Sequence, residues 1–342
     1  MSTIKVIGID LGKSSFHLVA HDYSGREQFR KHLSRAKLIE FLAQTPATII
    51  AMESCGGSHW LARKCQSFGH EVKLIPPQYV KPYVKPYVKT NKNDYIDADA
   101  IAEASTRPSM RFVGVKTETA QVISVIQRIR SSYVKERTAC MSRIGAILLE
   151  FGMSFPKGHS KMKSLFQWLA YSKESIPQML MQELIEHHEY YLQLNERIAG
   201  QDNKLKQLVE QNEDAQLLKS IPGVGNLTAS QCLADISDVG HFKNGRQLAA
   251  WIGLVPHQYS TGGKTTLLGI SKRGNKALRT LFIHGARSIL SRPEVAVAVF
   301  GEWILELRAR KPFNVAVVAL ANKLVRIAWS VLSTKQAFEV RV

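Results

Sequence analysis

The sequence predicts an α/β domain at the N-terminus, a helical coiled-coil region in the middle and a mainly α-helical domain at the C-terminus. Three observations predict this order. Strand-like and helical segments alternate up to Arg111, apolar residues then recur at helical spacing, and a heptad repeat fills residues 180–208. We place the domain boundaries at residues 1–115, 116–215 and 216–342.

The N-terminal domain consists of short apolar segments bounded by glycines, prolines and acids. Strands are predicted at residues 5–10, 15–21, 26–33, 48–53 and 71–75, and helices at residues 37–43 and 60–67. Because strands and helices are interleaved, we expect these segments to form one α/β sheet.

A heptad repeat marks the middle of the chain. Its seam steps alternately by four and three residues, which is typical of a coiled coil or a long helical hairpin. Residues 174–214 contain nine acids against three Lys or Arg, a net charge of −6. We therefore expect this region to contact protein rather than DNA. The seam consists of Leu180, Leu184, His187, Tyr191, Leu194, Ile198, Gln201, Leu205 and Leu208.

The chain as a whole is strongly basic, and its positive charge lies outside residues 174–214. The 342 residues contain 46 Lys and Arg against 28 Asp and Glu, a net charge of +18. Such an excess favours a polyanionic partner, because each neutralised phosphate releases counterions. No membrane partner is expected, because the most apolar stretch, Val315–Leu332, contains Asn322, Lys323 and Arg326. The N-terminus enters a strand pattern directly and the four cysteines lack CxxC spacing, so we expect a cytoplasmic protein without a zinc or disulfide framework.

Four carboxylates lie at the ends of predicted elements. Asp10 and Glu53 each end an apolar strand, while Asp94 and Asp97 precede the helical run 98–104. A buried carboxylate without a partner is costly, so packing explains these positions poorly. Hard oxygen ligands suit Mg²⁺, and two such ions can assist phosphodiester chemistry. The alternative for Asp94 and Asp97 is capping of the following helix.

These motifs resemble a known family. The order Gly8-Ile-Asp10, the strand-end Glu53 and Asn93-Asp-Tyr-Ile-Asp97-Ala is similar to the RuvC-like DEDD domain of insertion-sequence transposases that use a structured guide (bridge) RNA. The segment Leu74–Tyr83 and the strings Ser260-Thr-Gly-Gly-Lys264 and Ile270-Ser-Lys-Arg-Gly274 resemble the subgroup with subterminal inverted repeats. One departure is visible, because Tyr-Val-Lys-Pro is repeated at residues 79–82 and 83–86.

The resemblance implies a fold and a reaction. It implies an RNase H-like (RuvC-type) N-terminal domain that holds Mg²⁺, two ions per site, and a C-terminal transposase domain. It implies recombination of donor and target DNA, guided by the RNA, through a serine covalently joined to DNA. It further implies a dimer or tetramer, in which the acids of one subunit meet the serine of another, in the nucleoid-associated cytoplasm of a bacterium.

A basic aromatic segment precedes Asp94. Tyrosines that can stack on unpaired bases alternate with lysines that can bind phosphates, and Pro82 and Pro86 are expected to prevent a regular helix. The alternative is a proline-rich linker that lies on the domain surface with its tyrosines partly buried. The candidate contacts are Tyr79, Lys81, Tyr83, Lys85, Lys89 and Lys92.

A glycine-rich turn opens the C-terminal domain. Ile221-Pro-Gly223-Val-Gly225 before a helix resembles a helix-hairpin-helix turn, in which Gly223 and Gly225 let backbone N–H groups approach a phosphate. A tight turn between packed helices explains the same residues equally well.

A hydroxyl pair beside two glycines is the candidate nucleophile. Read from the residues alone, this segment is equally a β-turn. The family resemblance assigns the nucleophile to Ser260, with Thr261 as its rival. Lys264, Lys272, Arg273, Lys276 and Arg279 are then expected to line the DNA backbone.

Three other functions would each account for some of these features. An actin-like sugar kinase or ATPase shares a glycine loop such as Gly8–Lys13, but it needs a second phosphate loop, for which Asp238-Val-Gly240 is a poor candidate. A Holliday-junction nuclease shares the acids but has no use for Ser260. A non-catalytic RNA-binding protein explains the charge but not four carboxylates.

Overall fold

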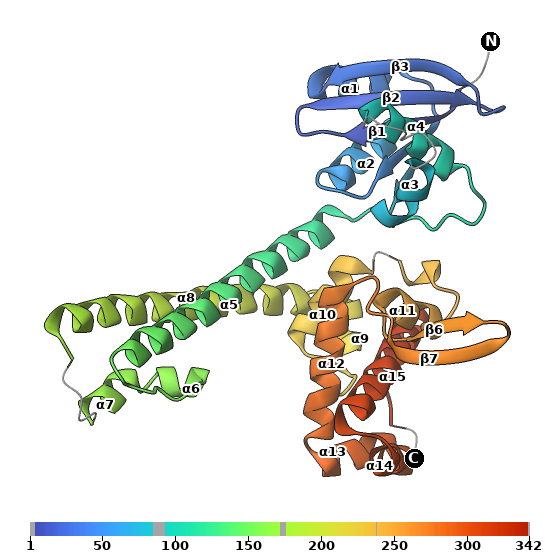
Figure 1. Ribbon diagram of the computed structural model, residues 1–342. Helices are drawn as coiled ribbons and strands as arrows, with labels where there is room; N and C mark the ends of the chain where they lie inside the picture. Colours follow the sequence, from blue (N-terminus) through green and yellow to red (C-terminus); the bar gives the residue numbers. More distant parts are fainter. Residues whose placement is uncertain (1–3, 85–92, 172–175, 237, 341–342) are drawn as a thin grey trace. The chain divides into compact units, whose positions relative to one another are not determined.

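The computed structural model describes residues 4–84, 93–171, 176–236 and 238–340. They form two compact units, Met1–Thr117 and Glu118–Val342 (Figure 1). Each unit has hydrophobic clusters of its own. The α/β character of the first unit and the helical character of the second confirm the predicted fold class.

The first unit contains a mixed five-stranded sheet in the order β3-β2-β1-β4-β5. Strands β1, β2 and β3 are antiparallel neighbours, whereas β1, β4 and β5 run parallel. Its elements are β1 (Ile4–Leu11), β2 (Ser15–Asp22), β3 (Glu27–Ser34), α1 (Arg35–Gln44), β4 (Ile49–Glu53), α2 (Ser58–Ser67), β5 (Glu71–Ile75), α3 (Pro77–Val84) and α4 (Asp94–Ser105). Every predicted strand of this domain is confirmed within two residues.

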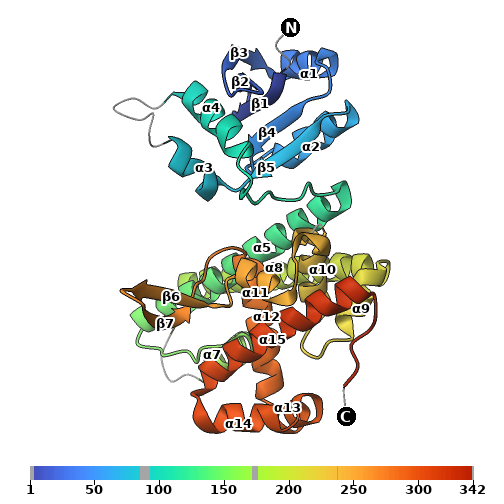
Figure 2. The same ribbon diagram turned by 90° about the vertical axis from the view of Figure 1, so that its right-hand side faces the viewer.

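The two faces of the sheet are covered by different helices (Figure 2). Strand side chains alternate between faces, so Ile7 and Ile9 of β1 pack with α1 and α2. Val6 of β1 and Ala51 of β4 instead pack with α3 and α4. Gly8 and Asp10 share the face of Val6. The sheet therefore directs Asp10 toward α4.

Helix α3 corrects one expectation. Pro82 was expected to prevent a regular helix, yet Pro77–Val84 is helical with Pro82 inside it. Pro77 stands at the first helical position, where its missing N–H is not required. Buried Val80 anchors the helix against the sheet. Packing on an apolar face therefore outweighs the intrinsic cost of Pro82.

The second unit begins with a long helical hairpin. Helix α5 (Glu118–Glu150) packs along α8 (Gln178–Glu210), and the short helices α6 (His159–Met162) and α7 (Leu165–Ala170) lie between them in sequence. Five of the nine seam residues are buried within the chain, since Leu184, Tyr191, Leu194, Ile198 and Leu205 are at most 5% exposed. Leu180, His187, Gln201 and Leu208 are half-buried. Of the two predicted arrangements, the structure has the intrachain hairpin.

The remaining helices of the second unit form a helical domain. They are α9 (Glu213–Lys219), α10 (Asn226–Asp235), the 3-10 turn η1 (Val239–His241), α11 (Gly245–Ile252), α12 (Lys276–Leu290), α13 (Pro293–Phe300), α14 (Glu302–Arg310) and α15 (Phe313–Thr334), with the strands β6 (Pro256–Thr261) and β7 (Lys264–Ile270). Helix α15 packs against α9, α11, α12 and α14. It is long and apolar enough to cross a membrane by length and composition alone, and half of that stretch is buried. Leu320, Ala321 and Leu324 of α15 are fully buried in the largest cluster.

Candidate functional site

Asp10 and Glu53 end neighbouring parallel strands. The ladder between β1 and β4 pairs Gly8 with Ala51 and Ile9 with Met52. The next residues on the two strands are Asp10 and Glu53. Because side chains alternate in step along paired strands, both carboxylates lie on the face that α4 covers. The register thus brings two acids that are far apart in sequence to one edge of the sheet.

Gly8 sets how closely α4 approaches that edge. A Cβ atom at Gly8 would lie 2.2 Å from the carbonyl oxygen of Ala98 and 2.7 Å from the backbone nitrogen of Ala102. Only glycine therefore allows the helix backbone to rest directly on β1. The N-terminal turn of α4 carries Asp94 and Asp97. Asp97 is four residues before Ile101, which is buried in the α4–sheet core, so Asp97 lies on the stripe that faces the sheet.

The capping role expected as the alternative belongs to another residue. The side chain of Asn93 accepts a hydrogen bond from the backbone N–H of Tyr95 at 2.9 Å and caps α4. Asp94 and Asp97 follow it inside the first turn. Their negative charge still suits the positive end of the helix dipole, but the cap itself does not need them.

A histidine that the sequence interpretation missed joins the acids. His17 of β2 is the register partner of Asp10, and its Nδ1 lies 3.6 Å from an Asp94 carboxylate oxygen. Ligand atoms of Asp10, His17 and Asp94 all lie within 4.8 Å of one another. The signal was available: the β1–β2 hairpin turns between Lys13 and Ser14, so counting back along both strands pairs Asp10 with His17.

These residues fit a divalent cation. Two carboxylates and an imidazole are donors that such ions bind. Glu53 and Asp97 are not part of the tight group of three, and they lie at the same edge of the sheet. The negative charge of this edge affects the nearby Cys55. Burial raises the pKa of its thiol, and the charges of Glu53 and Asp10 raise that pKa further. Four acids from three elements and His17 therefore make up the candidate metal site.

Three of the six residues of the predicted basic aromatic segment lie within the described residues. Tyr79 and Lys81 are exposed on α3. Tyr83 is half-buried, and its ring lies 5.7 Å from the Arg107 guanidinium. Lys85, Lys89 and Lys92 lie outside the described residues. Tyr79 and Lys81 remain available to a ligand, whereas Tyr83 packs against its own domain.

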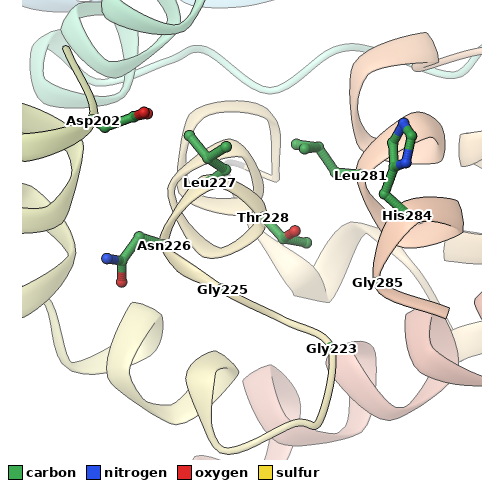
Figure 3. A pocket seen from close by; sticks show the side chains of 9 residues that line it. All are labelled: Asp202, Gly223, Gly225, Asn226, Leu227, Thr228, Leu281, His284 and Gly285. Atoms are coloured by element: carbon green, nitrogen blue, oxygen red, sulfur yellow. The ribbon is translucent and has the colours of Figure 1, made fainter. Parts of the chain in front are cut away.

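The glycine-rich turn lines a pocket of about 450 Å³ (Figure 3). In Figure 3 the N-terminal turn of α10 lies between Asp202 of α8 and His284 of α12. Gly223 has φ +80°, and a Cβ there would lie 2.9 Å from the Gly285 carbonyl oxygen. Gly223 is therefore required by packing against α12. Gly225 has open space around it, so packing does not explain that glycine.

Ser260 lies on a two-stranded hairpin. Strands β6 and β7 pair Gln258 with Leu267, Ser260 with Thr265 and Thr261 with Lys264. Gly262 and Gly263 form the turn with φ values of +55° and +78°, which suits a tight hairpin turn. The Ser260 hydroxyl oxygen accepts a hydrogen bond from the Gln258 amide at 2.7 Å. The sequence interpretation recognised the turn but not the flanking strands.

The predicted cations of the C-terminal domain separate into two kinds. Lys264, Lys272, Arg273 and Lys276 are exposed. Arg279 is 9% exposed, and its Nη1 donates to the carbonyl oxygens of Ile252 at 2.7 Å and Arg273 at 3.1 Å. Arg279 thus fixes the backbone of the loop that carries Lys272 and Arg273, and its own guanidinium is not available to DNA.

This basic region contains no acid to offset it. From Val239 to Pro293 the sequence has no Asp or Glu but nine Lys and Arg residues. All of these cations except Arg279 are exposed. An exposed surface of one sign that its own segment leaves uncompensated favours phosphate binding.

Comparison with known proteins gives matches along the whole chain. A transposase model of the DEDD type matches residues 7–153, and the model "Transposase IS116/IS110/IS902 family" matches residues 215–299. The transposase for insertion sequence element IS1328 of Yersinia enterocolitica is 44% identical over 99% of both chains. The transposase for IS1111A of Coxiella burnetii is 39% identical, covering 99% of this chain and 92% of the relative. The pilin gene-inverting protein of Moraxella bovis is 23% identical over 98% of both chains.

Proposed function

The chain belongs to the IS116/IS110/IS902 family of transposases, and on that premise we propose that it recombines donor and target DNA through a metal-dependent site and a serine nucleophile. As a transposase it transfers DNA phosphodiester bonds. The observation that best supports the proposed metal site is the meeting of Asp10, Asp94 and His17 within 4.8 Å at one sheet edge. Glu53 is beside Asp10 in the strand register.

The proposed metal is Mg²⁺, with two ions per site. Asp10, Glu53, Asp94 and Asp97 would hold it, and the bound cation would supply positive charge to the phosphate under attack and to its leaving oxygen. The residues of the chain fix its place: Gly8 admits α4, and α4 carries two of the acids to the strand ends. A glycine stands two residues before Asp10 because any side chain at that position would push α4 and its two acids away from the strand ends.

The proposed nucleophile is the hydroxyl of Ser260. Its oxygen would form a bond to a DNA phosphorus while the phosphorus–oxygen bond to one deoxyribose breaks, and the serine proton would end on the released DNA hydroxyl. A hydroxyl of the other DNA would then attack the same phosphorus and release the serine. The number of phosphodiester bonds is unchanged, so no nucleotide cofactor is needed. The exposed position of Ser260 on the β6–β7 hairpin supports access of DNA to it.

The proposed partners are donor DNA, target DNA and a structured guide RNA. The acid-free segment of residues 239–293 supports a polyanionic partner, and exposed Tyr79 and Lys81 support contact with unpaired bases and phosphates. Gly225 opens onto the α10 N-terminus, where backbone N–H groups favour a phosphate. We further propose self-association as a dimer or tetramer, and action in the bacterial cytoplasm at the nucleoid.

A kinase and a junction nuclease each leave the second unit of the chain unexplained. An actin-like kinase needs a second phosphate loop beside strands, but residues 239–241 form a 3-10 turn, and β6 and β7 are the only strands that the described part of the second unit contains. A Holliday-junction nuclease leaves the second unit unexplained.

The experiment is a recombination assay with purified protein, its copurified RNA, donor and target plasmids, and Mg²⁺. Joined donor–target product that requires protein, RNA and Mg²⁺ is expected. Product formed equally well after ribonuclease treatment would remove RNA guidance. Product formed equally well in excess chelator would remove the metal site, and each failure leaves the other claim standing.

A further inference from the structure

We infer that His17 is a ligand of the same metal ion as Asp10 and Asp94, and that its ring nitrogen makes this site bind a transition-metal dication such as Mn²⁺ more tightly than Mg²⁺. The inference rests on the proposed metal site. It adds a donor of different chemistry and, with it, a choice of metal.

The donor atoms of Asp10, His17 and Asp94 are spaced closely enough to bind one ion. Two ligands of one small dication, each about 2.1 Å from it, lie roughly 3 Å apart when adjacent and roughly 4.2 Å apart when opposite. The Nδ1 atom of His17 lies 3.6 Å from Asp94 Oδ2, and all three donor atoms lie within 4.8 Å of one another. An ion between them needs only small side-chain adjustments.

A second histidine of β2 makes a different contact with α4. His21, on the same strand, contacts Asp99 of α4 at 2.7 Å, which is a normal hydrogen-bond distance. The 3.6 Å between His17 and Asp94 is too long for one. Strand β2 and helix α4 thus form one hydrogen-bonded His–Asp pair at His21. They form one longer His–Asp pair, without a hydrogen bond, at His17. His21 provides the hydrogen bond between β2 and α4, and the longer His17–Asp94 distance leaves the two donor atoms far enough apart to bind one ion.

The His17 ring is held in place by two neighbouring rings. It stacks on His32 with ring centroids 4.6 Å apart, and it meets the edge of Tyr95 at 4.8 Å. Its side chain is 18% exposed, and β2 is an interior strand of the sheet. A ring held on two sides presents its nitrogen in one direction. Such preorganisation is what a metal ligand requires.

The chemistry of the donor atoms determines which metal the site prefers. Mg²⁺ prefers oxygen ligands and strict octahedral geometry, whereas imidazole nitrogen suits first-row transition metals. A carboxylate pair alone would discriminate between them only weakly. Adding one nitrogen shifts the preference toward the transition metal. Mn²⁺ is the useful probe because it accepts carboxylates and is paramagnetic.

The test is electron spin echo envelope modulation of the full-length protein loaded with one equivalent of Mn²⁺, without DNA. Modulation from a directly bound ¹⁴N nucleus is expected. His17→Phe keeps an aromatic ring for stacking but has no nitrogen, so the modulation should disappear and the Mn²⁺ Kd should rise about tenfold, as for loss of a metal-site contact. The Mg²⁺ Kd, measured by competition, should change less than twofold.

His32→Phe is the matched control, because it removes the stacked neighbour's nitrogens and leaves His17 in place. The modulation should persist in that variant. A bound Mn²⁺ spectrum without ¹⁴N modulation in the unmodified protein would overturn the inference, whatever the variants do. Modulation that survives His17→Phe would also overturn it. Free aqueous Mn²⁺ in the presence of excess protein is a different result, because it would remove the proposed metal site itself.

Discussion

Ser260 and Thr261 are adjacent in sequence but face opposite sides of the β6–β7 hairpin. Ser260 pairs with Thr265, on the face that also carries Gln258 and Leu267. Thr261 pairs with Lys264 on the other face. DNA that approaches one hydroxyl therefore meets a different set of side chains from DNA that approaches the other. The lysine next to the glycine pair is a neighbour of Thr261 rather than of Ser260.

The hairpin geometry makes the choice of nucleophile testable. Ser260→Ala should abolish the covalent protein–DNA adduct, because it removes the hydroxyl oxygen that would bond to the DNA phosphorus. Thr261→Ser should retain the adduct, and RNA binding should be unchanged in both variants because phosphate contacts dominate it. Denaturing gels and peptide mapping measure the result. An adduct mapped to Thr261 would transfer the role to the Lys264 face.

The carboxylate edge predicts loss of reaction without loss of fold. Asp10→Ala, Glu53→Ala, Asp94→Ala or Asp97→Ala should abolish recombination. In the metal-free protein the melting temperature should change little, because relief of repulsion among the acids offsets the favourable contacts that each carboxylate loses. Strand-exchange assays and thermal melts in chelator measure the two effects. Recombination by the Asp10 and Glu53 variants at the unmodified rate would end the metal-site proposal.

Two glycines of one turn should behave differently. Gly223→Ala places a Cβ against the α12 backbone at a positive φ, so it should destabilise the second unit by about 1–3 kcal/mol. Gly225→Ala meets no atom within 4 Å and has φ −98°, so its stability should change by less than about 0.5 kcal/mol. Denaturant unfolding measures both.

The informative variant is Gly225→Ala. If a phosphate approaches the α10 N-terminus, the added methyl should weaken DNA binding about tenfold in a stable protein, a cost of roughly 1.4 kcal/mol. Unchanged DNA affinity would mean that this turn only connects helices.

The helical hairpin predicts a contrast between two leucines of α8. Leu194 is 1% exposed in the seam, whereas Leu192 is 44% exposed. Leu194→Lys buries a charge against α5 and should cost more than about 3 kcal/mol. Leu192→Lys should change the stability by less than about 0.5 kcal/mol. Thermal melts measure the difference, and light scattering reports whether either variant changes the oligomeric mass. Equal melting temperatures would contradict the intrachain seam.

The strands and acids of the first unit were predictable because their signals are local. Each strand is an apolar run bounded by a turn, and Asp10 and Glu53 directly follow such runs. His17 was missed because its role depends on the pairing register, which links residues on different strands. Helix α3 was missed because packing of Val80 outweighs the preference of Pro82. The β6–β7 hairpin was missed because both of its faces are exposed, so its sequence lacks the alternation that marks a half-buried strand.

The exposure of β6 and β7 has a consequence for amide hydrogen exchange. A two-stranded ribbon without a core is marginally stable by itself, and every residue of β7 except Ile270 is exposed. Its amides should therefore exchange through local opening, far faster than those of the buried helix α15. The proposed nucleophile is carried by one of the least protected elements of the second unit. DNA that orders this ribbon should slow exchange there selectively, and the loss of that slowing would reveal release of the product.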